Sequence, residues 1–295
     1  MNHVEKPLTA TSSSESHGVL YLVATPIGNL SDMSARAVEV LRHVDRIACE
    51  DTRHSRPLLD RYGINRPLIS LHEHNEEQAT QGILSLLLQG ESLALISDAG
   101  TPLINDPGYP LVRMAHQAGI RVTPIPGPCA LIAALAASGL PSNRFAFEGF
   151  PPRKSGQRQA FFRELLNEKR TLIFYESSHR IIQTLGDLAS IFPRDRRLTV
   201  AKELTKQYET LIYATVGTAL EVFEQNEELK LGEFVVLIEG GSDTSSDELD
   251  AKSVAILSML LEETSLKTAV SLAAKITQMK KDLLYQEALK LKAGS

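Results

Sequence analysis

Short apolar runs alternate with stretches of helical periodicity along the first half of the chain. The apolar runs have the length and composition of buried strands and occupy residues 19–24, 44–49, 68–71, 93–96 and 121–125. Between them, residues 35–42, 57–62, 78–88 and 110–118 place apolar side chains at helical spacing. This alternation predicts an α/β domain with a parallel sheet and crossover helices.

The pattern changes after a helical stretch at residues 130–138. Apolar runs then lie at residues 145–150, 171–175, 198–204, 210–215 and 234–239, and helices are expected at residues 157–167, 180–191 and 218–227. Only five residues, 205–209, join the third and fourth of these runs. Because this link is too short for a crossover helix, the two strands should be antiparallel, and the second domain should contain a mixed sheet.

A chain of 295 residues is long enough for two domains and a small appendage. Residues 1–17 lack periodicity and are expected to form a disordered leader. We assign residues 18–128 to an N-terminal parallel α/β domain and 129–241 to a C-terminal mixed α/β domain. Residues 242–250, rich in Ser and Asp, are expected to be a linker. Residues 251–295 predict three short helices of a size compatible with a helix-turn-helix-like appendage.

The amino-acid composition is that of a globular protein without membrane-spanning segments. With 43% hydrophobic and 23% charged residues, the chain is globular rather than disordered or fibrous. No apolar run is long enough to span a membrane, and the N-terminus lacks a secretory signal pattern, so we expect a cytoplasmic protein without membrane association. The two cysteines, Cys49 and Cys129, offer neither a disulfide framework nor a CxxC site and are expected to be inert packing residues.

The charge is unevenly distributed. The net charge of −5 argues against a uniformly basic surface that coats nucleic acid. Residues 150–170, however, carry six Lys or Arg against two acids, and residues 251–295 carry seven Lys against four acids. These two basic segments are either ordinary solvated helix faces or contacts for a polyanion.

Unusual loops follow the predicted strands of the first domain. They read Thr25-Pro26-Ile27-Gly28-Asn29, Glu50-Asp51-Thr52-Arg53, Ser97-Asp98-Ala99-Gly100-Thr101-Pro102 and Pro126-Gly127-Pro128-Cys129-Ala130. In an open parallel sheet the ligand binds outside the carboxyl ends of the strands, where these loops meet. Gly and Pro at these points either simply form the turns or allow a ligand to approach the backbone closely. Asp98 could then accept hydrogen bonds from a ligand, and amides near Gly100 and Gly127 could hold a carboxylate.

Several familiar sites are absent from the sequence. Neither GxGxxG, nor the P-loop, nor the GxSxG elbow occurs. His72 and His74 are two residues apart, which fails the spacing that places two imidazoles on one helical face, so no metal site is predicted. The adjacent acids Glu50 and Asp51 are more typical of a helix cap than of paired catalytic carboxylates.

The four loops, with Asp106-Pro107-Gly108, resemble those of the tetrapyrrole-methylase-like superfamily of S-adenosylmethionine-dependent methyltransferases (class III). Within it, Tyr175-Glu176-Ser177-Ser178-His179-Arg180, Lys202-Glu203-Leu204-Thr205-Lys206 and the lysine-rich terminus resemble the branch that methylates ribosomal RNA. The resemblance spans residues 18–292. It implies a two-domain α/β fold with a C-terminal helical appendage, and methyl transfer to the 2′-hydroxyl of a cytidine in 16S rRNA, near the decoding centre of the small ribosomal subunit. It also implies a homodimer.

The resemblance further implies where S-adenosylmethionine binds. The expected cofactor-binding residues lie in the strand-end loops and in the second domain: Pro26, Gly28, Asp98, Gly100, Thr101, Pro102, Pro126, Gly127, Ala130, Tyr175 and Ala201. The superfamily's usual Gly-Asp-Pro is replaced here by Ser97-Asp98-Ala99, which argues against a tetrapyrrole substrate.

A ribose hydroxyl is a poor nucleophile and benefits from a general base or from a cation that stabilises alkoxide character. Candidates are Glu50, Asp51, His54, Lys202 and Glu203; Asp51 and Lys202 rank first because each lies at a predicted strand end, although each is equally explained as a cap or ion-pair partner. Phosphate contacts are assigned to Arg53, Arg56, Arg153, Lys154 and Arg158. Two other functions stay open: methylation of a tetrapyrrole or other small substrate, and a non-catalytic RNA-binding assembly factor.

Overall fold

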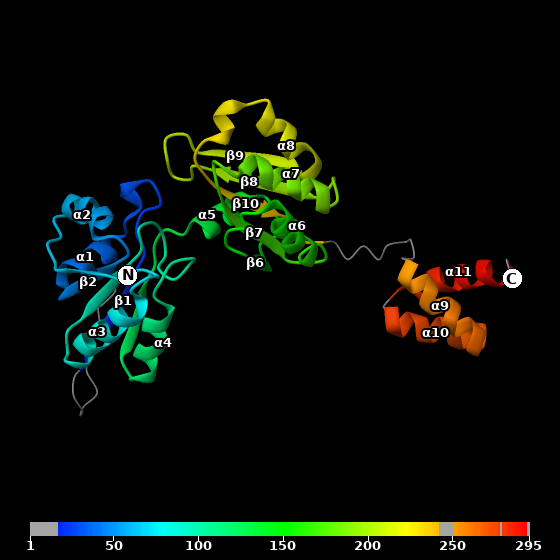
Figure 1. Ribbon diagram of the computed structural model, residues 1–295, viewed down its shortest axis with the longest axis horizontal. Helices are drawn as coiled ribbons and strands as arrows, with labels where there is room; N and C mark the ends of the chain where they lie inside the picture. Colours follow the sequence, from blue (N-terminus) through cyan, green and yellow to red (C-terminus); the bar gives the residue numbers. More distant parts are fainter. Residues whose placement is uncertain (1–16, 242–250, 278, 294–295) are drawn as a thin grey trace, which may run out of the picture.

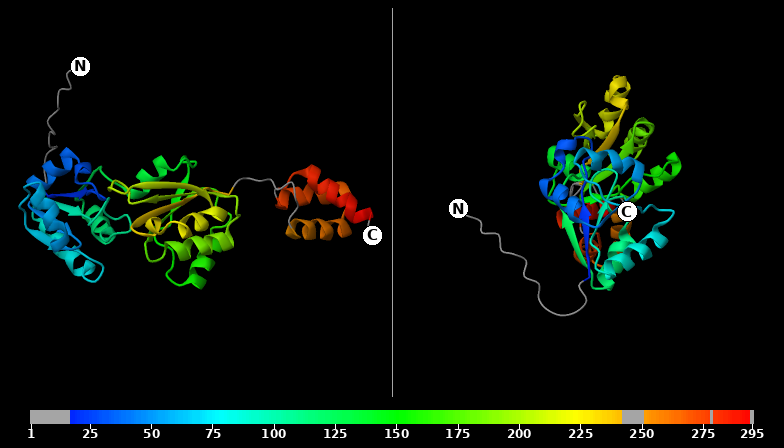
Figure 2. Two further views of the ribbon diagram at one scale, coloured as in Figure 1. Left: turned by 90° about the horizontal axis from the view of Figure 1, so that it is seen from above. Right: turned by 90° about the vertical axis from the view of Figure 1, so that its left-hand side faces the viewer.

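The computed structural model describes residues 17–241, 251–277 and 279–293. Residues 1–16 of the predicted leader and the whole predicted linker, 242–250, lie outside the described residues. Figure 1 shows two sheet-containing domains followed by three helices, and the side view in Figure 2 shows the same succession. No described helix is long and apolar enough to cross a membrane.

The first sheet is parallel and has the strand order β3-β2-β4-β1-β5. Its strands are β1 (Val19–Val23), β2 (Arg46–Cys49), β3 (Leu68–Ser70), β4 (Leu93–Ile96) and β5 (Arg121–Ile125). The crossovers contain α1 (Ala35–His43), α2 (Thr52–Arg61), α3 (Glu76–Leu88) and α4 (Tyr109–Gln117), with a short 3-10 turn, η1 (Leu30–Asp32), before α1. The parallel sheet and its helices confirm the alternation predicted from the sequence.

Helices cover both faces of this sheet because its strands are apolar on both sides. Along β1, Leu20 packs toward α3 and α4, whereas Val23 packs toward α1 and α2. Leu41 and Leu87, on helices of opposite faces, are both completely buried. Burying one such side chain contributes about 1.5–3 kcal/mol. The two apolar layers therefore fix the sheet and, with it, the positions of the loops at its carboxyl edge.

The second sheet is mixed, with the order β6-β7-β10-β8-β9. Its strands are β6 (Phe145–Phe147), β7 (Thr171–Ser177), β8 (Arg197–Lys202), β9 (Thr210–Thr215) and β10 (Glu233–Ile238). Only β6 and β7 pair in parallel; β8 and β9 are antiparallel, as the short link between them predicts. The helices are α6 (Ser155–Glu164), α7 (Ile181–Ile191) and α8 (Val216–Glu224), and a 3-10 turn, η2 (Glu227–Lys230), precedes β10.

Helix α5 (Ala130–Ala137) leads from the first sheet to the second. It follows β5, yet Leu131 and Leu135 pack against Ile173 and Val235 of the second sheet. Helices α6, α7 and α8 pack against the other face of that sheet, in a core that contains Phe162. The carboxyl edge of the first sheet faces the side of the second sheet that α5 covers, because Gly100 of the first domain lines one cavity with Ala201 and Val235 of the second.

The remaining helices, α9 (Ala251–Glu263), α10 (Leu266–Thr277) and α11 (Lys281–Ala293), form a separate small core. Leu257, Val270 and Leu284 contribute one buried side chain from each helix. This agrees with the three helices predicted for the appendage. The exact domain boundaries stay a prediction.

Several element ends differ by a few residues from the sequence prediction, and two of these differences affect the loops near the sheets. Helix α2 begins at Thr52 rather than at residue 57, because the Asp51 carboxylate accepts a hydrogen bond from the Arg53 amide and caps the helix earlier. Strand β6 stops at Phe147, and the chain turns at Gly149 with a φ of 65°. Beyond this turn, Phe150 packs on Tyr175 of β7 instead of extending the strand.

Candidate functional site

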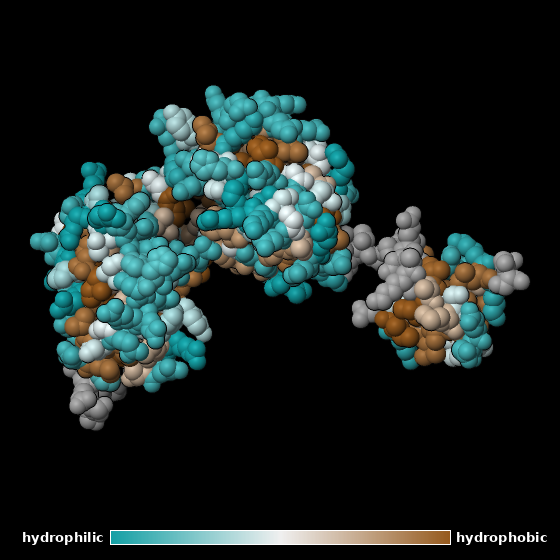
Figure 3. All heavy atoms as spheres, viewed as in Figure 1, coloured by the Kyte–Doolittle hydropathy of each residue, from teal (hydrophilic) through white to brown (hydrophobic). Residues whose placement is uncertain are grey.

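A cavity of about 320 Å³ lies between the two sheets. The loops after β4 and β5 form one side of it, and strands β7, β8 and β10 form the other. Figure 3 shows apolar surface where the two domains approach each other. A mostly apolar cavity at a domain interface and at the carboxyl edge of a parallel sheet is the usual location of a small-ligand site.

Five of the predicted cofactor-binding residues line this cavity: Gly100, Thr101, Ala130, Tyr175 and Ala201. Another three, Pro26, Asp98 and Pro102, each neighbour a lining residue in the chain, at Ile27, Ala99 and Thr101. Gly28, Pro126 and Gly127 are exposed and do not line it. The structure therefore brings together the loops that the sequence singled out, but only part of each loop faces the cavity.

The loop after β4 is fixed by hydrogen bonds to the loop after β1. The backbones of Thr25 and Gly100 exchange two hydrogen bonds, of 2.9 and 3.1 Å. The hydroxyl of Ser97 donates to the Gly100 carbonyl at 2.9 Å. Gly100 has a φ of 89°, and the same loop holds Leu103 and Asn105 at φ values of 71° and 66°. Left-handed backbone at two non-glycine residues is strained and is typical of functional loops.

The loop after β5 lies close against these two loops. The Thr101 hydroxyl donates to the Pro128 carbonyl at 3.0 Å. A Cβ atom at Gly127 would come within 2.9 Å of the Ala24 Cβ, so the close approach requires glycine there. The three loops thus form one rigid rim at the carboxyl edge of the first sheet.

Three carboxylates, Glu50, Asp98 and Asp106, gather behind this rim. Burial raises the pKa of Asp106 to about 6, and the negative charges of Glu50 and Asp98 add to the shift, against a hydrogen bond from Ser97. Burial and the charge of Asp98 likewise raise the pKa of Glu50. Of the three, Asp106 lines the cavity. A half-buried carboxylate that titrates near neutrality has the properties of a proton acceptor.

Asp106 was not among the candidates that we derived from the sequence. Its neighbours in the chain are turn residues, and no pattern separates it from the other aspartates in loops. Asp98 is half-buried, and its Oδ1 atom has no hydrogen-bond partner among the described residues. Buried acceptors are nearly always paired, so an unpaired oxygen next to the lining residue Ala99 marks a position that a ligand donor could satisfy.

The opposite wall of the cavity is apolar and aromatic. The ring of Tyr175 packs edge-to-face on Phe147 and Phe150, with centroid distances of 4.8 and 5.7 Å. Its hydroxyl accepts a hydrogen bond from the Leu131 amide at 3.3 Å, while burial raises its pKa to about 12. Ala201, fully buried on β8, leaves the wall flat. Such a wall suits the apolar face of a ligand rather than a charged group.

The two predicted catalytic residues occupy different positions. Asp51 caps α2 and forms an ion pair of 3.2 Å with Arg53, which holds its pKa below the usual range. Lys202 is 6% exposed at the end of β8. Neither side chain lines the cavity. The structure thus gives Asp51 the capping function that its sequence context also allowed, whereas Lys202 follows the lining residue Ala201 without lining the cavity itself.

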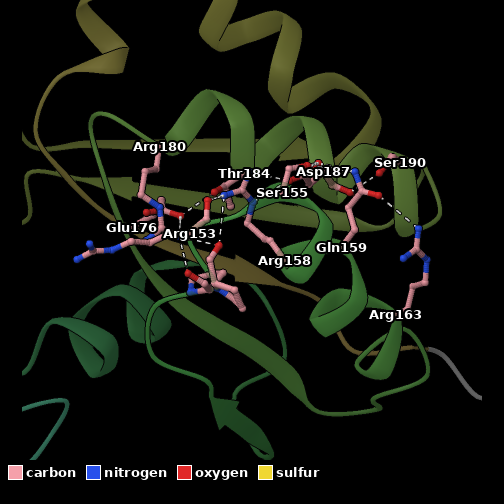
Figure 4. Close-up of polar contacts among 12 residues, drawn as sticks. Arg153, Ser155, Arg158, Gln159, Arg163, Glu176, Arg180, Thr184, Asp187 and Ser190 are labelled. Atoms are coloured by element: carbon pink, nitrogen blue, oxygen red, sulfur yellow. Dashed lines mark hydrogen bonds and ion pairs between the residues drawn. The ribbon is translucent and has the colours of Figure 1, made fainter.

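The residues predicted to contact phosphate differ in their exposure to solvent. Arg53, Arg153 and Lys154 are exposed, and Arg56 is half-buried on α2. The prediction for Arg158 is wrong, because its side chain is completely buried and forms an ion pair with Asp187 at 2.7 Å. Figure 4 shows this pair inside the second domain, with Ser155 and Gln159 around it.

The two cysteines, both expected to be packing residues, have different environments. Cys49 is a core residue as expected, whereas Cys129 is half-buried and lines the cavity.

Comparison with known proteins gives the family. The family of tetrapyrrole (corrin/porphyrin) methylases matches residues 19–220, and the RsmI C-terminal HTH domain matches residues 247–292. The chain is 49% identical over 278 residues to the ribosomal RNA small subunit methyltransferase I of Escherichia coli O157:H7, covering 94% of this chain and 97% of that protein. The chain belongs to this methyltransferase family. A second member, from Xylella fastidiosa (strain Temecula1), is 52% identical and covers 91% of this chain and 98% of its own.

Two solved structures of other proteins share the fold of this chain. A diphthine synthase superposes with a TM-score of 0.57 at 13% identity, covering 75% of this chain and 90% of its own. The methyltransferase CobJ gives a TM-score of 0.56 at 17% identity, with 76% and 95% coverage. At these identities the likeness concerns the fold alone, and it confirms the two-domain class III architecture.

Proposed function

We propose that this chain transfers a methyl group from S-adenosylmethionine to the 2′-hydroxyl of a cytidine in 16S rRNA of the small ribosomal subunit. The observation that carries the proposal is the cavity, formed by strand-end loops on one side and an apolar wall on the other. The RNA substrate is supported by relatives named ribosomal RNA small subunit methyltransferase I, which are about 50% identical over more than nine-tenths of the chain.

The residues of the cavity fit this cofactor. A volume of about 320 Å³ falls within the range of small-ligand pockets, roughly 300–1,000 Å³. Tyr175 and Ala201 would contact its apolar parts, and the backbone around Gly100 and Ala130 would contact its polar parts. The unpaired Asp98 oxygen would accept a hydrogen bond from it. When bound, S-adenosylmethionine supplies a methyl group on a sulfonium, whose carbon–sulfur electron pair returns to sulfur on transfer.

The chain's own residues would align the reactants and accept a proton. Alignment of two bound groups contributes several kcal/mol to the barrier reduction. As the ribose oxygen bonds to the methyl carbon, its hydroxyl proton must leave, and Asp106 is the cavity carboxylate suited to accept it. This assignment replaces Asp51 and Lys202, which do not line the cavity.

We also propose that the protein acts as a cytoplasmic homodimer. On the surface next to α5, Ile132 is 48% exposed and Tyr213 of β9 is 64% exposed, and the Tyr213 hydroxyl bonds the Ala137 carbonyl. Large apolar side chains exposed on these two elements suit contact with a second copy. Sedimentation equilibrium should give the mass of two chains.

The activity is tested with S-adenosylmethionine that carries a labelled methyl group. The protein is incubated with small ribosomal subunits, naked 16S rRNA and a tetrapyrrole in parallel, and labelled RNA is digested to nucleosides. We expect label on the ribose of cytidine. Label on the tetrapyrrole alone would support a small-molecule methylase, and cofactor binding without transfer to any acceptor would support a non-catalytic factor; either result contradicts the proposal.

A further inference from the structure

The 151–154 loop lies next to the cavity, and the side chains of Arg158 and Arg180 donate hydrogen bonds to its backbone carbonyls. It follows Phe150, which lines the cavity, and leads into α6. Arg180 donates hydrogen bonds to the Pro151 carbonyl and, at 3.3 Å, to the Pro152 carbonyl. Arg158 donates to the Pro152 carbonyl at 3.3 Å and to that of Arg153 at 3.1 Å. Three successive carbonyls of one loop are therefore fixed by two guanidinium groups (Figure 4).

Each of these arginines is itself anchored by a carboxylate from a neighbouring element. Arg158 is completely buried, and its Nε donates to Asp187 of α7 at 2.7 Å. Arg180 pairs with the buried Glu176 of β7 at 3.3 Å. A guanidinium carries five donors in a rigid plane and stays charged, so it can bond a carboxylate and loop carbonyls together.

Further hydrogen bonds keep the two carboxylates in place. Asp187 accepts from Ser155 at 2.9 Å and from Gln159 at 2.8 Å. Glu176 accepts from the Thr184 hydroxyl at 2.6 Å, and it also lines the cavity. The same network therefore connects the wall of the cavity with the base of the loop.

The two cationic side chains of the loop itself are not part of this network. Arg153 and Lys154 are exposed, and neither forms an ion pair with any residue that the structure describes. Pro151 and Pro152 restrict the backbone and supply no N–H donors. A stiff loop thus presents two free cations beside the cavity in which methyl transfer is proposed.

We infer that Arg158 and Arg180 are positioning residues that hold the 151–154 loop as a platform for two phosphates of the RNA substrate. The platform fixes the RNA backbone while the ribose enters the cavity. This inference rests on the proposed function. A preformed loop binds more tightly because little conformational freedom is lost on binding.

The inference distinguishes residues that contact phosphate from residues that position the loop. Replacing both Arg153 and Lys154 with Ala should lower the slope of log affinity against log salt by roughly 1.4, the value for two phosphates of a single strand. Arg180→Gln should instead leave the slope unchanged and weaken RNA binding roughly tenfold. The loss arises because the side chains of Arg153 and Lys154 become mobile in the free protein and must be ordered when RNA binds. A general loss of folded structure would not lower the RNA affinity while leaving its salt dependence unchanged.

The experiment measures the dissociation constant for 16S rRNA at several salt concentrations, together with tryptic cleavage after Arg153 and Lys154. Arg180→Gln and Arg158→Met are compared with Arg197→Gln, which breaks the exposed ion pair with Glu239 in the same domain. We expect faster cleavage and weaker RNA binding in the first two variants only. Calorimetry should show unchanged binding of S-adenosylmethionine in all three.

Pro152→Gly serves as a second route, since it loosens the loop without removing either buried ion pair. It should reproduce the loss of RNA affinity with an unchanged slope. Parental affinity in the folded variants, or a slope reduced as far as in the Arg153 and Lys154 double variant, would overturn the inference. If the parent protein itself fails to bind RNA, the proposed function fails instead.

Discussion

Replacing Asp106 with Asn tests the assignment of the proton acceptor. The carboxylate lines the cavity, and burial raises its pKa to about 6. With that pKa, about one-tenth of the carboxylates are ionised at pH 5 and about nine-tenths at pH 7, so the methylation rate should rise roughly tenfold over this range. The Asn variant cannot accept the proton and should be slower by about 10²–10⁴, without this rise.

The assay is a single-turnover measurement of labelled methyl transfer at saturating RNA, from pH 5 to pH 8. Several other titratable groups also face the cavity, namely Glu176, Lys206, Glu233, Cys129 and Tyr175, so the profile of the variant must be recorded beside that of the parent. Asp60→Asn, on the exposed side of α2, is the matched control and should leave the profile unchanged. An Asn variant that keeps the parental rate, or the same inflection near pH 6, would refute the assignment.

The same substitution has an opposite effect on stability. The folded-state pKa of Asp106 lies above its ordinary value of 3.8, so the folded state binds its proton more tightly than the unfolded state does. The corresponding stability is present below about pH 4 and is lost as pH rises to about 6. Asp106→Asn should therefore unfold at a higher temperature than the parent at pH 8. A gain in stability with a loss of rate distinguishes a catalytic group from a structural one.

Three further substitutions test the remaining assignments. Asp51→Ala removes a helix cap and should cost about 1 kcal/mol in urea denaturation while the methylation rate stays near that of the parent; a hundredfold slower rate would restore Asp51 as a catalyst. Ala201→Leu should fill part of the cavity and weaken S-adenosylmethionine binding about 5- to 150-fold by calorimetry, from about 1–3 kcal/mol of overpacking, and normal binding would move the cofactor elsewhere. Arg158→Met leaves Asp187 without its buried partner and should lower the free energy of unfolding by about 3–5 kcal/mol, whereas the exposed Arg163→Met should change it by no more than about 0.5 kcal/mol.

The strands could be predicted because their side chains follow the local pattern of burial. The apolar run of β4 is buried at every position, as expected for a central parallel strand. The antiparallel pairing of β8 and β9 follows from the length of their connection alone. The strand-end loops could also be located, since turn residues at the ends of parallel strands meet at one edge of the sheet.

The roles of individual charged residues could not be predicted in the same way. Arg158 lies in a basic segment and has the sequence context of a phosphate contact, yet Asp187, 29 positions away, pairs with it in the core. The environment of Asp106 likewise depends on Asp98, in the same loop after β4, and on Glu50, which follows a different strand, β2. Such contacts arise from the tertiary fold, and a local pattern of residues does not record them.

Cys129 offers the most direct test of the central claim that S-adenosylmethionine binds in the cavity between the two sheets. Its thiol lines that cavity and is partly exposed, whereas Cys49 is completely buried and burial raises its pKa, which makes it an internal control of slow reaction. The rate of alkylation by iodoacetamide is measured for each cysteine by mass spectrometry, with and without saturating S-adenosylmethionine. We expect the cofactor to protect Cys129 from alkylation and to leave the alkylation rate of Cys49 unchanged. Equal alkylation of Cys129 in the presence of bound cofactor would contradict it.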